Sequence, residues 1–419
     1  MNRLLIANRG EISIRIARAA AELGIITVAV YSREDERSLH VSKTDEAVLL
    51  EGRGANAYLD MAQMAELAKT NHCDALHPGY GFLSENAQFA ALLENSGVTF
   101  VGPTSDTLAR FGNKVSARKL AEDCNVALLT GSASAVSLDE ALAFYDSLPR
   151  GTDMIIKAVA GGGGRGMRIA RNTADIKSAY ERCISEADLA FGNPEVYVEA
   201  YLPNARHIEV QILGDGAGGV CHLWERECSI QRRHQKIVEI APCPSLSGDV
   251  RQALTSAAVK LAEAVNYRSL GTMEFLVDTS GKNFTFMEVN ARLQVEHTVT
   301  EAVTGIDLVQ AQLEVAAGKT LAELRLDQVN VPAPRGYAIQ ARINMETMKV
   351  DGSIKPNGGT LSVFEMPTGP GLRADTYGYA GYTTSAAFDS LLAKLIVHSS
   401  SGHYERVVRK VTARCVKRV

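Results

Sequence analysis

The sequence has no long apolar run and almost no excess of charge of one sign. A membrane-spanning helix needs about 18 or more consecutive apolar residues, and no such stretch occurs. Lysine and arginine together number 44 against 48 acidic residues, which gives a formal net charge of −4. A charge so close to balance provides no global field to attract nucleic acid or an anionic membrane. Any anionic ligand must therefore bind at a local site.

Cysteine is sparse and lacks any pairing pattern. The seven cysteines are odd in number, scattered, and never arranged as C-x-x-C, which argues against a disulfide framework and against a zinc site. A reducing cytoplasm fits this usage best. The amino-terminal segment turns polar after a few apolar residues, so no signal peptide is expected.

The chain of 419 residues exceeds one ordinary domain of roughly 100–150 residues, so two or three domains are expected. Residues 1–112 alternate short apolar runs with helical patterns, which predicts a doubly wound α/β domain. Residues 113–330 read as a mixed α+β domain that contains a glycine hairpin. Residues 331–419 are rich in turn residues between short strands, which predicts a small β-rich subdomain.

A glycine loop near residue 160 follows one strand pattern and precedes another. Gly161, Gly163 and Gly166 match G-x-G-x-x-G, but a dinucleotide fingerprint needs a helix after the glycines, and Met167 begins a strand pattern instead. A P-loop needs a lysine followed by serine or threonine, which this chain lacks here. The loop therefore predicts a hairpin whose backbone N–H groups cover phosphates, with Lys157 as a point charge. A merely flexible turn is the alternative.

Polar and apolar residues alternate strictly between Glu288 and Glu296. The polar positions are Glu288, Asn290, Arg292, Gln294 and Glu296. In a strand all five would share one face, and Glu274 on the preceding strand pattern could lie opposite Glu288. Carboxylates and an amide suit Mg²⁺, while Arg292 and Gln294 suit a planar oxyanion and Glu296 a general base. A half-exposed strand is the alternative.

A basic run, ERECSIQRRHQK, occupies residues 225–236. Gln231, His234 and Lys236 could reach phosphate, although the run is far too short for a nucleic-acid surface. A solvated charged face is the alternative reading. The stretch HIEVQ places His207 on one strand face with two other polar residues, a pattern that is more often structural than functional.

Several long motifs occur in one order along essentially the whole chain. They are IANRGEI, HPGYGFLSEN at 77–86, NKVSARK at 113–119, KAVAGGGGRGMR at 157–168, ERECSIQRRHQK at 225–236, MEVNARLQVEH at 287–297 and ARIN at 341–344. Together they resemble the biotin carboxylase family of ATP-grasp enzymes. The resemblance implies a doubly wound amino-terminal domain, an ATP-grasp fold with a mobile glycine-rich lid at about 130–200, and a small carboxyl-terminal β-rich subdomain.

The resemblance also implies a role for each matching residue. Around ATP it places Lys114, Lys157, Gly161, Gly162, Gly163, Gly164, Gly166, Glu199, Leu202, His207, Gln231 and His234. For Mg²⁺ or Mn²⁺ it implies Glu274, Glu288 and Asn290. For bicarbonate it implies Lys236, Arg292, Gln294 and Val295, with Glu296 as base. Tyr80 and Arg342 would face the ureido ring of biotin. The expected catalytic residues are Lys236, Arg292, Glu296 and Arg342.

The implied reaction uses MgATP and bicarbonate to carboxylate biotin through carboxyphosphate. No biotinylation motif of the Ala-Met-Lys-Met type occurs, so the biotin is expected on a carrier domain or carrier protein. An acyl-CoA carboxylase is the expected setting, although acceptor choice belongs to a separate carboxyltransferase and leaves pyruvate and urea open. A homodimer is a further expected partner. The alternatives are an ATP-grasp ligase that joins a carboxylate to an amine, and a silent nucleotide-binding regulatory subunit.

Three departures from the family pattern stand out. Ala200 occupies the place of a lysine that usually approaches adenine. Thr298 stands where the family often has proline, and little effect is expected from it. The chain stops earlier than the family usually does, as expected for a trimmed carboxyl-terminal subdomain, a fragment of a larger polypeptide or a divergent end.

Overall fold

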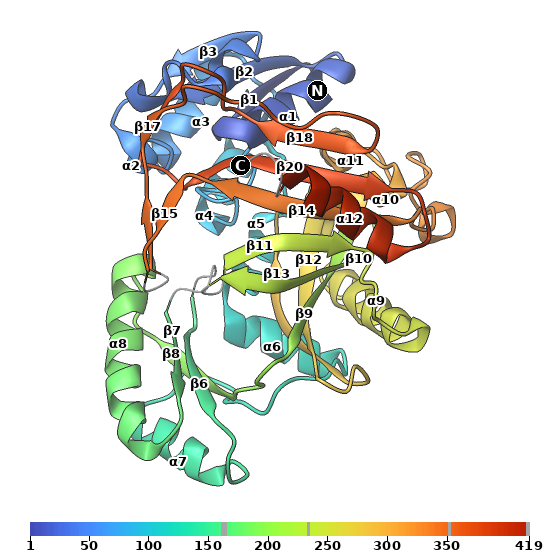
Figure 1. The fold of residues 1–419 in the computed structure, drawn as a ribbon. Helices are drawn as coiled ribbons and strands as arrows, with labels where there is room; N and C mark the ends of the chain where they lie inside the picture. Colours follow the sequence, from blue (N-terminus) through green and yellow to red (C-terminus); the bar gives the residue numbers. More distant parts are fainter. Residues whose placement is uncertain (161–165, 233–234, 351–352, 416–419) are drawn as a thin grey trace.

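The computed structural model describes residues 1–160, 166–232, 235–350 and 353–415 (Figure 1). The amino-terminal domain is built on a parallel sheet in the order β3-β2-β1-β4-β5. Its strands are β1 Arg3–Ile6, β2 Ile26–Tyr31, β3 Glu46–Leu49, β4 Ala75–His77 and β5 Thr99–Phe100. Its helices are α1 Gly10–Glu22, α2 Gly54–Ala57, α3 Met61–Thr70, α4 Ala87–Ser96 and α5 Ser105–Gly112, with short 3-10 turns η1 Arg33–Asp35 and η2 Leu39–Ser42. The predicted doubly wound α/β arrangement is confirmed.

Helix α1 shows why the sequence folds this way. Ile12, Ile16 and Ala20 recur at helical spacing, and all three are buried against β1 and neighbouring elements. The helix ends just before Gly24, which adopts a φ of +70° that suits glycine. The chain then re-enters the sheet as β2.

A small unit of three antiparallel strands in the order β7-β6-β8 lies apart from the main body (Figure 1). It comprises β6 Met154–Ala158, β7 Met167–Ala170, β8 Val196–Ala200, α7 Leu138–Ser147 and α8 Thr173–Phe191. Lys157 pairs with Met167 across β6 and β7, so the predicted glycine hairpin is confirmed in its two strands. Residues 161–165 at its tip lie outside the described residues. The unit has its own apolar core around Ile156 and Ile176, which allows it to pack as a separate body.

The central sheet has the order β13-β12-β9-β10-β11-β14-β20-β18. Its strands are β9 Arg206–Asp215, β10 Val220–Arg232, β11 Gln235–Ala241, β12 Arg268–Val277, β13 Phe284–Asn290, β14 Tyr337–Asn344, β18 Leu372–Thr376 and β20 Leu391–Ser399. Helices of this part are α6 Lys114–Asp123, α9 Gly248–Glu263, α10 His297–Thr304 and α11 Leu308–Ala316, with η3 Gln328–Asn330. No helix within the described ranges is both long and apolar enough to cross a bilayer.

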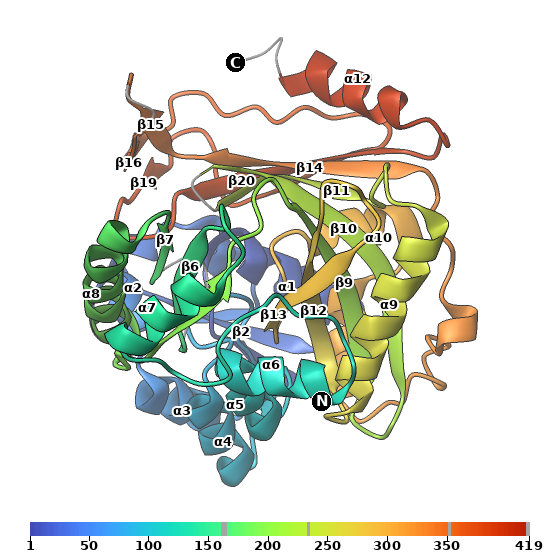
Figure 2. The ribbon, with the colours of Figure 1, turned by 90° about the horizontal axis from the view of Figure 1, so that it is seen from below.

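The carboxyl-terminal region is β-rich, as predicted. Its strands β14, β20 and β18 pair antiparallel and extend the central sheet beyond β11. Two short pairs, β15 Glu346–Met348 with β16 Ile354–Pro356 and β17 Gly359–Thr360 with β19 Thr383–Thr384, lie beyond it. Helix α12, Tyr404–Cys415, packs on β14 and β20 at the outside of the molecule (Figure 2).

One local prediction is wrong. The alternation from Glu288 to Glu296 predicted a single strand, but β13 ends at Asn290 and the chain continues as a loop to α10. The loop buries both apolar and polar residues. Ala291 and Leu293 contact the core, and Gln294 and Glu296 are also buried. Alternation alone could not distinguish this enclosed loop from a half-buried strand.

Candidate active site

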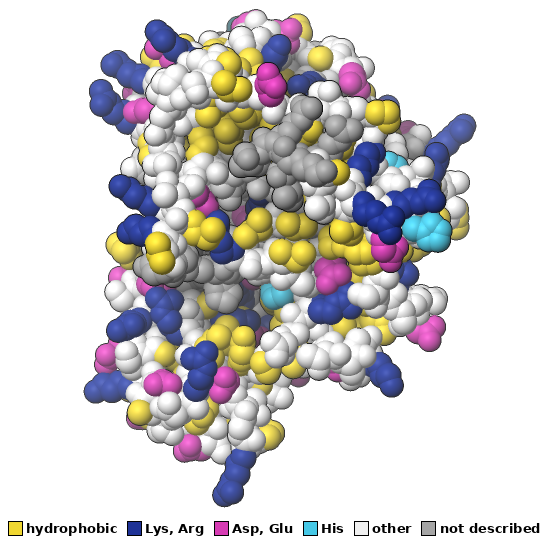
Figure 3. Space-filling model, in the orientation of Figure 1, with side chains coloured by type: hydrophobic (Ala, Val, Ile, Leu, Met, Phe, Trp, Pro, Cys, Tyr) yellow, Lys and Arg dark blue, Asp and Glu magenta, His cyan; other side chains and the backbone are white. Residues whose placement is uncertain are grey.

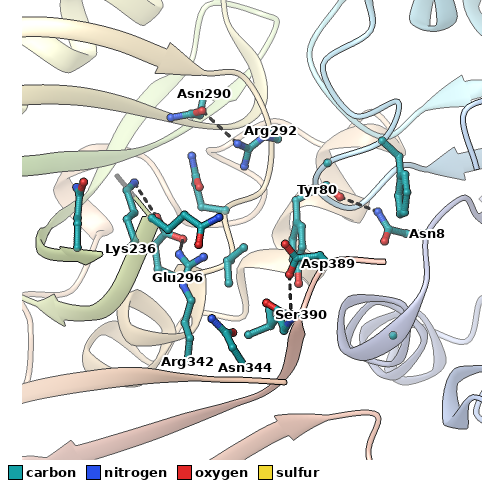
Figure 4. Close-up of a pocket in the computed structure, with 18 of the residues that line it drawn as sticks. Asn8, Tyr80, Lys236, Asn290, Arg292, Glu296, Arg342, Asn344, Asp389 and Ser390 are labelled. Carbon is teal, nitrogen blue, oxygen red and sulfur yellow. Dashed lines mark hydrogen bonds and ion pairs between the residues drawn. The ribbon is translucent and has the colours of Figure 1, made fainter. Parts of the chain in front are cut away.

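A cavity of about 590 Å³ lies where the amino-terminal domain, the β7-β6-β8 unit and the central sheet meet. The predicted site residues that line it are Tyr80, Lys114, Lys157, His207, Gln231, Lys236, Glu274, Glu288, Asn290, Arg292, Gln294, Val295, Glu296 and Arg342. Figure 4 labels Tyr80, Lys236, Asn290, Arg292, Glu296 and Arg342 among them. Gly166, Glu199 and Leu202 are described but do not line it. Gly161, Gly162, Gly163, Gly164 and His234 lie outside the described residues.

Two carboxylates face one another within the β12–β13 ladder. Glu274 pairs directly with Glu288, as the sequence predicted. Asn290 donates from Nδ2 to Glu274 Oε1 at 2.7 Å, and Lys114 Nζ lies 3.3 Å from Glu288 Oε2. Like charges directly opposite on neighbouring strands are destabilising unless a cation compensates them. These oxygen donors therefore fit a divalent cation of the Mg²⁺ type.

The two carboxyl groups differ in acidity. Burial raises the pKa of Glu274 to about 7, since Glu209 and Glu288 add negative charge that Lys236 only partly offsets. Burial would also raise the pKa of Glu288, but Lys114 and Lys157 lower it below its usual value. The Glu274 side of the pair thus has uncompensated negative potential, which a metal ion would relieve.

Lys236 on β11 forms ion pairs with three carboxylates at the cavity. Its Nζ lies 2.5 Å from Glu209, 2.7 Å from Glu274 and 2.8 Å from Glu296. Burial alone would lower its pKa, but these three carboxylates raise it well above its usual value. Glu209 also accepts a bond from the fully buried Arg226 at 2.5 Å. Lys236 is therefore a fixed positive charge between the paired carboxylates and Glu296.

Glu296 closes the loop after β13 and is completely buried. It accepts bonds from Lys236 and, at 3.0 Å, from Arg342 on β14 (Figure 4). Burial would raise the pKa of Glu296, but the cations Lys236, Arg342 and Arg226 hold it well below its usual value. The carboxylate is therefore ionised near neutral pH, as a general base must be.

The loop after β13 also presents groups suited to an anion. Arg292 is held at 2.8 Å by Glu85 of the amino-terminal domain and at 3.2 Å by Asn290 Oδ1. The amide nitrogen of Gln294 is buried and has no hydrogen-bond partner among the described residues. A buried donor without an acceptor costs free energy, so this nitrogen is available for a ligand oxygen.

At the hairpin end of the cavity, Lys157 is paired with Glu199 at 2.5 Å. Arg118 of α6 also bonds Glu199. Glu199 therefore orients Lys157 from behind the cavity wall. Gln231 donates to the carbonyl of Cys228 at 2.9 Å and lines the cavity, as does His207. Cations and polar groups therefore line the cavity together with Met167 of β7, an arrangement that suits a phosphate chain.

At the opposite end, Tyr80 donates to Glu11 of α1. Burial and the Glu11 carboxylate raise the pKa of the Tyr80 hydroxyl well above its usual value. Asn8 holds the loop that carries Tyr80 by donating to the carbonyls of Pro78 at 2.7 Å and Tyr80 at 2.8 Å. Gly79 is required here, because its φ is +64° and a Cβ would lie 2.8 Å from Asn8 Nδ2.

Sequence reasoning missed several charged residues that orient the site. Glu85 contacts Arg292, and Glu239 contacts Arg342. Glu209 contacts Lys236 and is itself paired with Arg226. Glu209 had a weak signal, because it alternates with His207 on β9. Glu85 and Arg226 lie within the quoted motifs but received no role of their own, and no local pattern indicated Glu239. On the visible face of the molecule, basic and acidic side chains are interspersed (Figure 3), which agrees with a local rather than a global anion site.

Family models cover nearly the whole chain. Residues 1–108 match the biotin carboxylase N-terminal domain, residues 113–324 the carbamoyl-phosphate synthase L chain ATP binding domain, and residues 340–415 the biotin carboxylase C-terminal domain. The chain is 48% identical over 421 residues to pyruvate carboxylase of Aspergillus terreus and 48% identical over 403 residues to that of Bacillus subtilis. It covers 35% and 34% of those proteins, about a third of their length.

Solved structures agree in fold. The biotin carboxylase domain dimer of Hydrogenobacter thermophilus 2-oxoglutarate carboxylase, in complex with MgADP, ADP and bicarbonate, superposes with a TM-score of 0.94 at 40% identity, covering 99% of this chain and 90% of that one. Biotin carboxylase of Campylobacter jejuni in a β,γ-ATP complex gives 0.93 at 35% identity, covering 99% and 91%. The chain therefore belongs to the biotin carboxylase family of ATP-dependent ligases.

Proposed function

We propose that this chain carries out the first half-reaction of a biotin-dependent carboxylase, in which MgATP and bicarbonate carboxylate biotin on a carrier. One arrangement carries the proposal: Lys236 and Arg342 flank the buried base Glu296 beside the paired carboxylates Glu274 and Glu288. The residues proposed to bind phosphate, metal and bicarbonate all include members that line this one cavity, which supports the proposal.

Lys114 and Lys157 would neutralise the ATP phosphates, and the glycine hairpin would cover them. The other nucleotide contacts proposed from the family pattern are Glu199, Leu202, His207, Gln231 and His234, with Gly161, Gly162, Gly163, Gly164 and Gly166 in the lid. Glu274, Glu288 and Asn290 would hold Mg²⁺ or Mn²⁺, which supplies charge neutralisation on the phosphates when bound. Ala200 leaves the adenine without the lysine contact usual in the family.

Arg292, Gln294, Val295 and Lys236 would bind bicarbonate. Glu296 would take the bicarbonate proton as an oxygen of bicarbonate attacks the γ-phosphorus, forming carboxyphosphate while ADP leaves. The unpartnered amide nitrogen of Gln294 supports this placement. Bicarbonate competes for the cations that lower the pKa of Glu296, so its binding is expected to strengthen the base.

The second step would take place between Tyr80 and Arg342. Carboxyphosphate would release CO₂ and phosphate, phosphate would remove the ureido proton of biotin, and the ureido nitrogen would bond the CO₂ carbon. Arg342 would stabilise the negative charge that develops on the ureido oxygen. The closed cavity would keep water from the intermediate.

The proposed domain division is 1–112, 113–330 and 331–419, and the three family models, which match residues 1–108, 113–324 and 340–415, support it. The 48% identity to pyruvate carboxylases favours pyruvate over an acyl-CoA as the final acceptor. A separate carboxyltransferase would select that acceptor, and a biotin carrier and a second copy of the chain are the other proposed partners.

Six described cysteines are buried free thiols, which fits a reducing compartment such as the cytoplasm, although the human and mouse relatives are named mitochondrial.

The purified chain is expected to hydrolyse ATP in the presence of Mg²⁺ only when bicarbonate is added, and free biotin is expected to stimulate the reaction. Phosphate release would be measured in CO₂-free buffer with and without bicarbonate. Release that ignores bicarbonate, or that responds instead to an amine and another carboxylate, would overturn the proposal in favour of a different ATP-grasp ligase. No ATP turnover, with MgATP still raising the melting temperature, would identify a silent nucleotide-binding protein.

Glu288→Gln is expected to weaken metal binding and hence productive ATP binding, because the substitution removes one of two facing carboxylates. The KM for MgATP should rise, and excess Mg²⁺ should partly restore turnover. Glu227→Gln is a suitable control, since Glu227 is a part-buried carboxylate paired with Arg206 away from the cavity. If excess Mg²⁺ did not restore turnover in Glu288→Gln, Glu288 would not be a metal ligand.

A further inference from the structure

Arg342 lies in an electrostatically unfavourable place. Across the β14–β20 pair it stands directly opposite Lys394, a fully buried cation. Like charges at directly opposed strand positions repel each other. Lys394 is held by Glu11 at 3.0 Å and by the carbonyl of Val295 at 3.1 Å. A negatively charged group is therefore needed beside the Arg342 guanidinium to hold it in the cavity.

Glu239 of β11 provides that contact. It is fully buried, its Oε1 accepts a hydrogen bond from Arg342 Nε at 2.6 Å, and a terminal nitrogen of Arg342 lies 2.6 Å from the same oxygen as an ion pair. Burial raises the pKa of Glu239, and the nearby Glu296 carboxylate raises it further, while Arg342 opposes both effects. Glu239 does not line the cavity, and it contacts the cavity residue Arg342 directly.

The second oxygen of Glu239 is occupied as well. Gln340 stands directly opposite Glu239 in the β11–β14 ladder and donates from Nε2 to Oε2 at 2.9 Å. Gln340 precedes Arg342 by two residues on β14, so both side chains point to the same face. An amide can bind a carboxylate only through its nitrogen, and a rotated Gln340 would present its oxygen to Glu239 instead.

Thr298 on α10 fixes the orientation of that amide. Its buried hydroxyl donates to Gln340 Oε1, which leaves Nε2 directed at Glu239. From the sequence alone, little effect was expected from Thr298. We propose that Thr298, Gln340 and Glu239 form a buried chain of hydrogen bonds that positions Arg342 for the carboxylation of biotin. This inference rests on the proposed function for its effect on catalysis, but the chain of contacts itself does not.

The test compares three threonine variants. Thr298→Val removes the hydroxyl at nearly constant volume, and Thr298→Ser restores it. Thr304→Val is the matched control, because Thr304 is a buried threonine of the same helix whose hydroxyl donates to the carbonyl of Thr300 at 2.7 Å. Carboxybiotin formed per ATP hydrolysed would be measured for each, together with the melting temperature.

Thr298→Val is expected to lower carboxybiotin formed per ATP by about two- to tenfold, the effect of one lost neutral hydrogen bond. Thr298→Ser and Thr304→Val should keep the wild-type ratio. Glu239→Gln should lower it further, because a charge-assisted contact is lost. Equal ratios in Thr298→Val, Thr304→Val and wild type would overturn the inference, whatever the change in melting temperature.

A measurement without turnover separates this inference from the proposed function. The Nε proton of Arg342 can be observed by NMR in arginine-labelled protein and assigned by its absence in Arg342→Lys. Thr298→Val should speed its exchange with water several-fold, while Thr304→Val should not. Unchanged exchange would reject the chain of contacts. Altered exchange in a protein without bicarbonate-dependent turnover would reject only the proposed function.

Discussion

Glu296→Ala is expected to lower bicarbonate-dependent turnover by about 10²–10⁴, the usual contribution of a positioned acid or base. Glu296 is fully buried, ionised and in contact with Lys236 and Arg342. Its removal takes away the proposed acceptor of the bicarbonate proton. MgATP binding should change little, because the proposed phosphate-binding lysines Lys114 and Lys157 make their ion pairs with Glu288 and Glu199 instead. Calorimetric titration of MgATP beside a phosphate-release assay would separate the two effects.

Glu296→Gln distinguishes the loss of the base from the loss of packing. The amide keeps the shape and one acceptor oxygen but cannot take a proton at neutral pH. It should therefore lose as much activity as the alanine variant. Glu301→Gln is the control, since Glu301 is a buried carboxylate paired with Arg15 and Arg373 and does not line the cavity. Turnover of Glu296→Gln near the wild-type value would move the base to another residue.

Arg342→Ala is expected to depress carboxybiotin formation by about 10²–10³, the usual cost of losing one oxyanion partner. Bicarbonate-dependent ATP hydrolysis should fall much less, because that step precedes biotin. The two reactions should therefore uncouple. Phosphate release and labelled carboxybiotin would be measured side by side in the wild type and the variant. Equal loss of both would mean that Arg342 serves the first step or holds the site together.

The Arg342 variant leaves Glu239 and Glu296 without a shared cation, so some loss of stability is expected. Arg373→Ala provides the matched control. Arg373 also bridges two carboxylates, Glu301 at 2.7 Å and Asp375 at 2.7 Å, away from the cavity. It should lower the melting temperature while leaving carboxybiotin formed per ATP unchanged. That pattern would assign the uncoupling in Arg342→Ala to the site rather than to stability.

The periodicity of apolar residues in the sequence predicted helices and strands whose formation depends on nearby residues. Helical spacing in α1 and the β-branched run of β2 indicated the doubly wound domain. The strand, glycine and strand order around Lys157 indicated the hairpin. The register of Glu274 against Glu288 was also predicted, because two adjacent strands with matched acidic positions leave few pairings. The direction of the chain after Asn290 was not predicted, since this enclosed loop shows the same alternation of polar and apolar residues as a strand.

The sequence by itself therefore determined the family, the fold class and 14 of the 30 residues that line the cavity, because long motifs and side-chain periodicity are local properties. Only the tertiary structure revealed how those residues are held. Glu239 and Gln340 are 101 positions apart, and Thr298 and Gln340 are 42 apart. No local period connects such residues. Their contacts exist because α10 packs on β14 and β14 pairs with β11, and that packing decides where the Arg342 guanidinium can point.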